Sequence, residues 1–238
     1  MIYRNLKKKR TGLRSLWLFL VDIPKGSEGH VMKRGWYSRR VFPKLLNWSM
    51  VQSGFIPLRQ SLLAQASGAV LEIGFGTGAN FKFYPSHVPS LTAIDPNPGM
   101  VPLARSHLAE GVVSVHLALA SAEWLPFPST SFDTVVSTMT LCSVPHLSKA
   151  LQEMLRVVKL GGRLLFLEHG ESPDRSVRRW QDGLTPVWKH LGDGCHLNRP
   201  IAEVIQEQCW KVTALDRFYL PGVPKPFGYF YQGVAVKS

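Results

Sequence analysis

Apolar runs alternate with amphipathic stretches along the chain from residue 69 onward. The apolar runs predict strands at 69–73, 90–95, 112–118, 133–137 and 163–168. The stretches that separate and follow them predict helices at 77–84, 98–109, 147–158, 174–190 and 199–208. This alternation is typical of βαβ units and predicts a mostly parallel sheet. The last segments, 210–218 and 228–236, alternate with period two and predict a closing antiparallel pair.

The N-terminal quarter of the chain follows a different pattern. It is rich in large apolar side chains, and Pro43 and Pro57 suit the first turns of two helices. We expect these helices near 43–52 and 57–66. The predicted organisation is a basic amphipathic extension at 1–30 and one domain at 31–238, made of a helical lid at 31–66 and a Rossmann-like core at 67–238.

A glycine-rich turn follows the first predicted strand. Glycines 74, 76 and 78 stand at alternate positions in Glu72-Ile73-Gly74-Phe75-Gly76-Thr77-Gly78-Ala79-Asn80. Glycine lets backbone approach a ligand closely, and the N–H groups at a following helix start can face that ligand. The spacing Gly74-x-Gly76-x-x-Ala79 also fits the dinucleotide fingerprint, so a nicotinamide cofactor is an alternative.

Two further features argue against a nicotinamide cofactor. Glu72 places a carboxylate inside the first strand, where a hydride-transfer enzyme usually has an apolar residue. The second strand ends in Asp95, at the distance where an acid reaches ribose hydroxyls. With the segment Asp95-Pro96-Asn97-Pro98-Gly99-Met100 that follows, the pattern resembles the class I S-adenosylmethionine (SAM) methyltransferases.

This resemblance implies a fold, a cofactor and a set of contacts. The fold is a Rossmann-like α/β fold, with a mostly parallel seven-stranded sheet, a C-terminal antiparallel strand pair and N-terminal helices over the cleft. The cofactor is SAM, which leaves as S-adenosyl-L-homocysteine. The implied cofactor-binding residues are Glu72, Gly74, Gly76, Thr77, Gly78, Asn80, Asp95, Pro96, Asn97, Met100, Ser121, Ala122, Glu123, Thr138, Thr140 and Leu141. Ser121 stands where the family usually has an acid that contacts the adenine amine.

A narrower resemblance rests on longer motifs. They are the run from Gly76 to Pro85, Leu141-Cys142-Ser143-Val144, Glu168-His169, Gly194-Cys195-x-Leu197-x-Arg199 and Gly233-x-Ala235-Val236-Lys237. Together they resemble the methyltransferase-like 7 group of membrane-associated alkyl thiol methyltransferases. The resemblance implies S-methylation of small thiols or hydrogen sulfide. A lipid, a quinone or another small hydrophobic acceptor is the alternative.

The acceptor side of the site is less marked in the sequence. A thiol attacks as its thiolate, and His169 and Asp193 are the candidate catalytic groups that accept or steer its proton. Trp36, Tyr37, Trp48 and Cys142 are the candidate substrate-binding residues. The competing interpretation is structural for each of them: core aromatics, a surface histidine, and packed thiols at Cys142 and Cys195. No metal is expected, because no cluster has ligand spacing.

Charge is concentrated near the N-terminus. The formal net charge is +12, and residues 1–66 hold 13 Lys and Arg against 2 Asp and Glu, whereas residues 67–238 hold 15 against 14. Within residues 1–23, basic residues accompany apolar ones at helical spacing, which suits an anionic membrane surface. A solvated tail, a helix packed on its own domain and a nucleic-acid arm are the alternatives.

Composition and motifs narrow the class of protein. Three cysteines without a CxxC pair indicate reduced thiols. No apolar run reaches the ~20 residues of a membrane span, so we expect a cytoplasmic protein, peripheral at the inner face of a membrane. A nucleic-acid partner is not expected, because the Pro-Pro-aromatic loop that serves base amino groups is absent after the fourth strand. A non-catalytic binding protein would be expected to lose Glu72, the glycines and Asp95.

Overall fold

A single seven-stranded sheet forms the centre of the molecule. The computed structural model describes residues 35–50 and 54–238. The strands are β1 (Val70–Ile73), β2 (Leu91–Asp95), β3 (Val115–Leu119), β4 (Phe132–Thr138), β5 (Val158–His169), β6 (Trp210–Tyr219) and β7 (Tyr229–Lys237). Their order is β3-β2-β1-β4-β5-β7-β6, with β7 antiparallel to both β5 and β6 and the other pairs parallel. This order confirms the predicted Rossmann-like fold.

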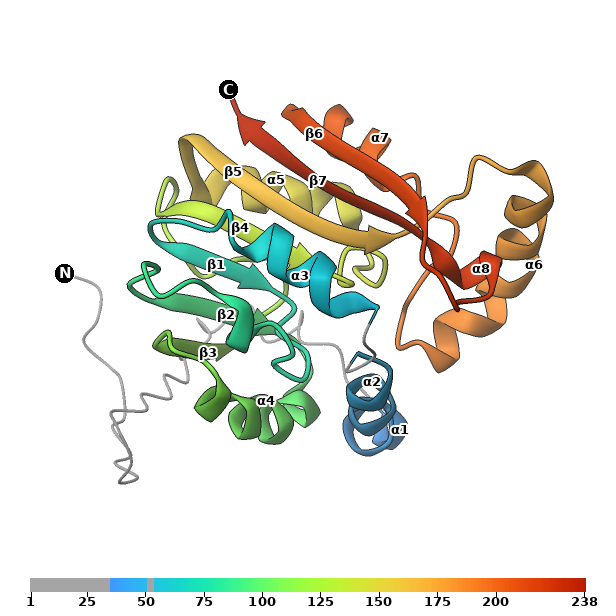
Figure 1. The fold of residues 1–238 in the computed structure, drawn as a ribbon, viewed down its shortest axis with the longest axis horizontal. Helices are drawn as coiled ribbons and strands as arrows, with labels where there is room; N and C mark the ends of the chain where they lie inside the picture. Colours follow the sequence, from blue (N-terminus) through green and yellow to red (C-terminus); the bar gives the residue numbers. More distant parts are fainter. Residues whose placement is uncertain (1–34, 51–53) are drawn as a thin grey trace.

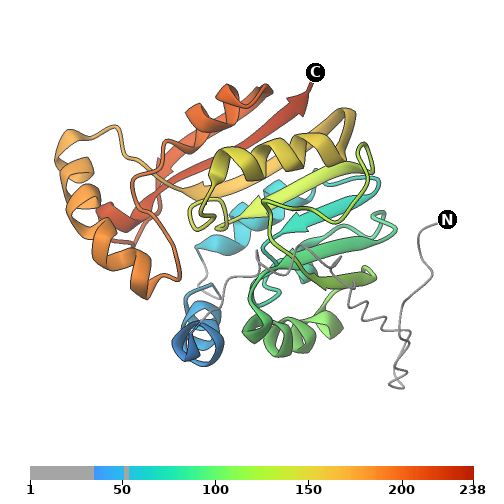
Figure 2. The same cartoon turned by 180° about the vertical axis from the view of Figure 1, so that it is seen from behind.

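Helices cover both faces of the sheet. They are α1 (Trp36–Arg40), α2 (Phe42–Met50), α3 (Phe55–Leu63), α4 (Val101–His107), α5 (Leu147–Val157), α6 (Arg175–Leu191), α7 (Ile201–Glu207) and α8 (Lys225–Gly228). Helix α3 lies over one face (Figure 1), whereas α5 and α7 lie over the other (Figure 2). No helix within the described residues is long and apolar enough to span a bilayer.

The interior strand β5 contributes side chains to two hydrophobic cores, one on each face of the sheet. Its side chains alternate between faces, as a strand requires. Leu164 and Phe166 pack in the core shared with α5 and α7, and Leu165 and Leu167 pack in the core shared with α3. All four are fully buried. A strand with apolar residues at successive positions therefore belongs in the middle of a sheet that is covered on both sides.

One predicted element is wrong. The chain from 77 to 84 contains only the 3₁₀ helix Phe81–Phe83 in place of an α-helix. Gly78 has φ +84, which an α-helix does not allow, and Pro85 follows directly. The other predicted strands and helices are present with shifted ends. The predicted extension at 1–30 lies outside the described residues, and the division into domains stays a prediction.

The topology decides where a site can form. The parallel strands β1, β2, β4 and β5 all end at the same edge of the sheet, where α/β proteins bind their ligands. Helices α1 and α2 lie beside this edge (Figure 1). The loops that follow the four strands therefore meet helices from the N-terminal part of the chain.

The close packing of β7 against β5 yields a stability prediction. A Cβ at Gly233 would lie 2.5 Å from the Phe166 ring and 2.6 Å from the Ala214 carbonyl. We expect Gly233→Ala to lower the free energy of unfolding by about 1–3 kcal/mol, measured by urea denaturation. The control is Gly183→Ala within α6, where nothing lies within 4 Å and a gain of up to about 1 kcal/mol is expected. Equal midpoints for the two variants would contradict this packing.

Candidate active site

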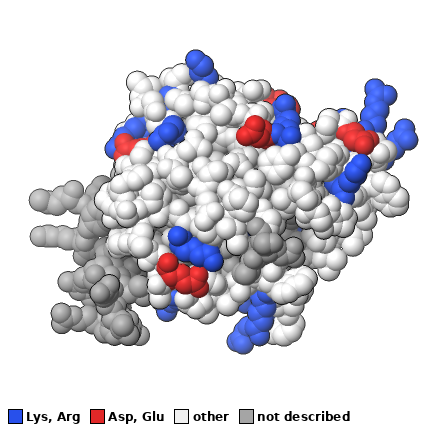
Figure 3. Space-filling model, viewed as in Figure 1, with Lys and Arg blue, Asp and Glu red and all other residues white. Residues whose placement is uncertain are grey.

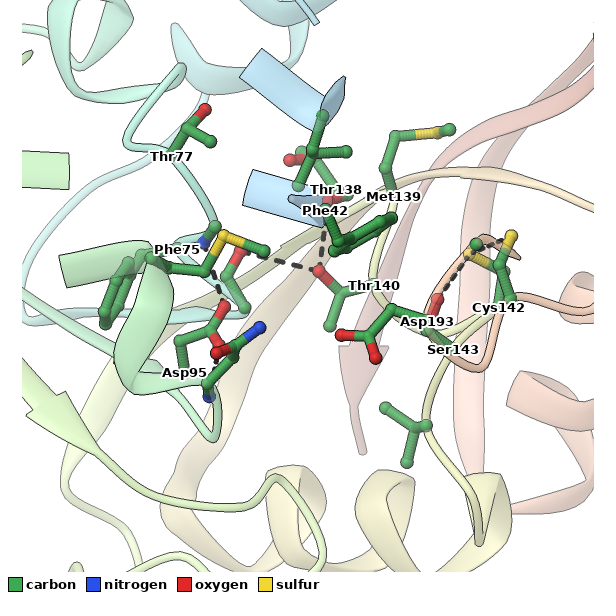
Figure 4. A pocket seen from close by; sticks show the side chains of 18 of the residues that line it. Phe42, Phe75, Thr77, Asp95, Thr138, Met139, Thr140, Cys142, Ser143 and Asp193 are labelled. Atoms are coloured by element: carbon green, nitrogen blue, oxygen red, sulfur yellow. Dashed lines mark hydrogen bonds between the residues drawn. The ribbon is translucent and has the colours of Figure 1, made fainter. Parts of the chain in front are cut away.

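A cavity of about 610 Å³ opens at the carboxyl edge of the sheet. The loops after β1, β2, β3 and β4, with His169 at the end of β5, form one side of it, and α1, α2 and the end of α6 form the other. In the close view, Asp95 lies on one side of the cavity and Cys142 with Ser143 on the other, and Thr138 and Thr140 come from the end of β4 (Figure 4). We call the side of the cavity at Asp95 its nucleoside end and the side at Cys142 and Ser143 its acceptor end.

The nucleoside end is built from a tight turn and a carboxylate. Gly74 has φ +75, and a Cβ there would overlap the Thr140 side chain. The Asp95 carboxylate accepts hydrogen bonds from the Gly76 N–H (3.0 Å) and the Asn97 N–H (2.7 Å). Each carboxylate oxygen accepts more than one bond, so Asp95 fixes two loops and keeps capacity for a ligand.

A buried polar network lies behind this turn. The Asn80 amide donates to Glu72 Oε1 and to Thr138 Oγ1, both at 2.8 Å, and the Tyr84 hydroxyl donates to Glu72 Oε2 at 3.1 Å. Burial raises the pKa of Glu72 to about 7, although these bonds and the charge of Arg59 oppose the rise. Burial also lowers the pKa of Arg59 to about 10, against the attraction of Glu72.

One acceptor atom at this end has no partner. Asn80 is 3% exposed, and its Oδ1 makes no hydrogen bond within the described part of the chain. A buried acceptor without a donor is costly, by about 1–3 kcal/mol. A ligand with hydroxyl or ammonium donors would relieve that cost.

Glu168 organises the loop after β4. Its fully buried carboxylate accepts bonds from Ser137 Oγ and from the N–H groups of Thr140, Leu141 and Cys142, at 2.8 to 3.4 Å. Burial raises the pKa of Glu168, while the backbone donors favour its charged form. This single side chain sets the positions of residues that belong to both ends of the cavity.

Two sulfur atoms and an imidazole meet at the acceptor end. His169 Nε2 lies 2.7 Å from Cys195 Sγ, and the sulfur atoms of Cys142 and Cys195 lie 3.6 Å apart. His169 and Cys142 are buried and Cys195 is partly exposed. The three residues come from the end of β5, the loop after β4 and the loop after α6.

Helix α1 connects the two ends. The Ser38 hydroxyl donates to the Asp193 carboxylate (3.0 Å), and the Asn97 amide donates to the Ser38 carbonyl (2.8 Å). The Tyr37 hydroxyl donates to the Leu191 carbonyl (2.9 Å). One short helix is thereby fastened to the loop after β2 and to the end of α6.

Most of the predicted site residues line the cavity. Those that do are Glu72, Gly74, Gly76, Thr77, Asn80, Asp95, Pro96, Asn97, Met100, Ser121, Ala122, Thr138, Thr140, Tyr37, Trp48, Cys142, His169 and Asp193. Four predicted residues, Gly78, Glu123, Leu141 and Trp36, do not.

Each of these four side chains has another environment. Gly78 packs on Phe81, and Leu141 is fully buried in the core. The Glu123 carboxylate accepts the His146 N–H at 2.7 Å, next to the start of α5. Trp36 is 73% exposed on α1. These four residues therefore lie outside the cavity lining, and their assignment to the binding site stays a prediction.

Several cavity residues were not predicted. Cys195 was interpreted as a packed thiol, yet it contacts His169. It stands in one of the motifs that carried the narrower resemblance, as Cys142 and His169 do, and that shared membership was the available signal. Met139 and Asp193 have φ +54 and +50, a conformation that is uncommon outside glycine, and no sequence signal marked it.

The comparisons with known proteins agree with this geometry. Residues 71–166 match the model of a methyltransferase domain. The N-methyltransferase NodS from Bradyrhizobium japonicum, solved with S-adenosylhomocysteine, has the same fold. Its TM-score is 0.56 and its identity 17%, over 83% of this chain and 99% of that one. The match to the domain and the strand order define a class I SAM-dependent methyltransferase.

Two sets of relatives place the chain more narrowly. Thiol S-methyltransferase TMT1B of Rattus norvegicus is 40% identical over 172 residues, which are 71% of this chain and 70% of the relative. The ubiquinone/menaquinone biosynthesis C-methyltransferase UbiE of Pseudomonas putida is 30% identical over 171 residues, 68% of this chain and 66% of the relative. The chain belongs to the methyltransferase family that includes TMT1B, the methyltransferase-like 7 group.

The residues of the nucleoside end fit SAM. Its ribose diol and its ammonium group are donors, and Asp95 and Asn80, which both line the cavity, carry acceptor oxygens. The turn at Gly74 lies where a side chain would collide with Thr140. The donor and acceptor chemistry of this end is therefore that of the family's cofactor.

The buried Glu72 yields a prediction on pH. A carboxyl group whose pKa rises from 4.5 to about 7 on folding stabilises the fold below pH 4.5, and this contribution is lost as pH rises through 7. Between pH 4.5 and 8, the wild type should lose roughly 3 kcal/mol more stability than Glu72→Gln. Denaturant unfolding without SAM measures this difference.

The control for this prediction is Glu203→Gln, an exposed carboxylate on α7 that pairs with Arg217. Its stability should follow the wild-type curve over the same pH range. If Glu72→Gln also followed the wild-type curve, Glu72 would not carry the pH dependence.

Proposed function

We propose that the protein transfers a methyl group from SAM to a small apolar thiol, such as an alkyl thiol or hydrogen sulfide. The observation that carries the proposal is the cavity itself, which joins the Asp95 end to the Cys142–His169–Cys195 end. Its lining includes apolar side chains, with Phe42, Leu46, Val223, Phe227 and Phe230 among them. The thiol methyltransferase activity named for TMT1B supports the same acceptor.

The cofactor-binding roles follow from the geometry above. Asp95 would hold the ribose hydroxyls, and the backbone of Gly74 and Gly76 would approach the methionine part together with Asn80. Ser121 and Ala122 line the cavity beyond Asp95 and would face the adenine. When bound, SAM supplies a methyl group that is already activated by its positive sulfur, so the protein mainly has to orient the acceptor and exclude water.

The acceptor must lose a proton before or during attack. His169 and Asp193 both line the cavity and are the groups proposed to steer that proton. His169 stands beside the two sulfur atoms, whereas Asp193 accepts a hydrogen bond from Ser38 on α1. We therefore assign His169 to the acceptor and Asp193 to the closure of the cavity over it.

A second acceptor class has its own support. The apolar lining suits a lipid, a quinone or another small hydrophobic acceptor, and UbiE is named for quinone biosynthesis. The two proposals differ in the acceptor alone, because both use the same nucleoside end.

The proposal is tested by S-adenosylhomocysteine release with sulfide, a small alkyl thiol and a hydrophobic phenol as parallel acceptors. Turnover with the thiols alone is expected, and turnover with the phenol alone would overturn the thiol assignment. Asp95→Ala should weaken SAM binding by about 30- to 150-fold in calorimetry, the equivalent of about 2–3 kcal/mol. The matched variant Asp216→Ala, an exposed acid on β6, should bind SAM as the wild type does.

We also propose that the protein is cytoplasmic and docks on an anionic membrane surface near the cavity. Exposed apolar side chains occur on three helices beside it: Trp36 on α1, Leu45 and Trp48 on α2, and Val187 and Leu191 on α6. Over the face in Figure 3, most of the surface carries no charged side chain. The predicted basic helix within residues 1–23 would add electrostatic attraction.

Vesicle co-sedimentation tests the membrane proposal. On vesicles that contain phosphatidylserine, the double variant Trp36→Ser/Trp48→Ser should bind at least about tenfold more weakly, because each aromatic side chain gains about 1.5–3 kcal/mol on full burial. The control is Leu160→Ser, an exposed residue near the start of β5 and thus at the opposite edge of the sheet. Deletion of residues 1–23 tests the extension separately. Equal binding by all variants would contradict the proposal.

A further inference from the structure

The cluster at the acceptor end has the composition of a metal site. Cys142 Sγ, His169 Nε2 and Cys195 Sγ all lie within 4.8 Å of one another. Two sulfur ligands and one imidazole are a donor set typical of zinc. The three side chains come from the end of β5 and two separate loops, so the fold brings together residues that have no metal-ligand spacing in the sequence.

The sulfur–sulfur distance matches that of a tetrahedral site, whereas the nitrogen–sulfur distance is shorter. With zinc–sulfur and zinc–nitrogen bonds of about 2.3 and 2.0–2.1 Å, two sulfur ligands stand about 3.8 Å apart and a sulfur and a nitrogen about 3.6 Å apart. The two sulfur atoms are 3.6 Å apart, and the His169 nitrogen is 2.7 Å from Cys195 Sγ. The imidazole would therefore move by about 1 Å to admit an ion.

The surrounding structure holds the ligands in place. The His196 N–H donates to the Cys142 carbonyl at 2.9 Å, which joins the loop after β4 to the loop after α6. Glu168 holds the Cys142 N–H at 3.4 Å. His169 is the last residue of β5 and pairs with Phe230 on β7. Because these residues are already held in place, little conformational entropy would be lost when an ion binds.

The cluster has three members within the described residues, and all three line the cavity. Structural zinc sites are closed by four protein ligands, whereas catalytic ones use three and leave a position open. We propose that Cys142, His169 and Cys195 bind one thiophilic divalent ion, with Zn²⁺ as the best fit, and that the acceptor thiol takes the open position. This inference rests on the proposed thiol methylation.

The charges and atoms of such a step balance. Two cysteine thiolates and a divalent ion are neutral together, and the acceptor thiolate adds one negative charge opposite the positive sulfur of SAM. Cys142 and Cys195 would give up their thiol protons to water when the ion binds. With its Nε2 on the ion, His169 would hold the ion and would not take the acceptor's proton, so the acceptor thiol would also lose its proton to water, since an ion stabilises the thiolate form. Its sulfur lone pair then forms the bond to the methyl carbon as the bond from that carbon to the SAM sulfur breaks. The product thioether is neutral and a weaker ligand, so it leaves.

Metal binding is tested on the full-length protein. After removal of metal by a chelator under reducing conditions, Zn²⁺ should bind at one ion per chain in equilibrium dialysis, and Cd²⁺ should produce thiolate charge-transfer absorption. Cys195→Ser and His169→Ala should each weaken Zn²⁺ binding by at least about 100-fold, because loss of an outer partner alone costs about 10–100-fold. The matched control Cys209→Ser removes an exposed cysteine and should change neither signal. SAM calorimetry on each variant reports whether it is folded.

The result that overturns the inference is an absence of stoichiometric Zn²⁺ binding, or binding that survives in Cys195→Ser and His169→Ala while both variants still bind SAM. Thiol turnover separates the two proposals. If the metal-free protein methylates thiols as fast as the Zn²⁺-loaded protein, the metal inference fails and thiol methylation stands. If Zn²⁺ binds at the three residues and no thiol is methylated, the proposed acceptor fails, and the metal site remains without the role assigned to it here.

Discussion

The buried carboxylate of Glu168 is the interaction on which both ends of the cavity depend. It lies one residue before the end of β5 and accepts hydrogen bonds from four donors in residues 137–142. Thr140, fixed in this way, packs against Gly74 at the nucleoside end, and Cys142 stands at the acceptor end. Burying a charge is costly unless hydrogen bonds compensate, and here the compensating bonds also align the loop that separates cofactor from acceptor.

Two other acids repeat this arrangement at neighbouring strand ends. Asp95 holds two backbone N–H groups, and Glu72 receives side-chain donors from Asn80 and Tyr84. Because parallel strands end at one edge, the three carboxylates lie along the same rim of the sheet. Glu72 and Asp95 also line the cavity, so this rim offers acceptor oxygens to a ligand that carries hydrogen-bond donors.

The fold could be predicted from the sequence because its signals are local. Period-two and apolar runs gave every strand, and the Gly74 to Asn80 turn together with Asp95 gave the nucleoside end. The helix predicted at 77–84 does not form because Gly78 has a positive φ, which is incompatible with an α-helix. The segment forms a loop with one short 3₁₀ helix. Sequence spacing also does not show which way a side chain points: those of Glu123 and Leu141 turn toward the start of α5 and the core.

The acceptor end could not be predicted in the same way. Cys142, His169 and Cys195 are separated by 27 and 26 positions, and only the register of β4 against β5 and the path of the loop after α6 bring them together. Ser38 is similar, since nothing in its neighbourhood marks it as a residue that links two loops. Long-range convergence of this kind depends on tertiary packing, which hydrophobic periodicity does not encode.

The attachment of α1 has a consequence for both ends of the cavity. Ser38 contacts both the loop that carries Asn97 and the turn that carries Asp193, so the helix cannot release one without loosening the other. The nucleoside end and the acceptor end of the cavity are therefore joined mechanically through one residue of a five-residue helix, so a displacement at either end is transmitted to the other.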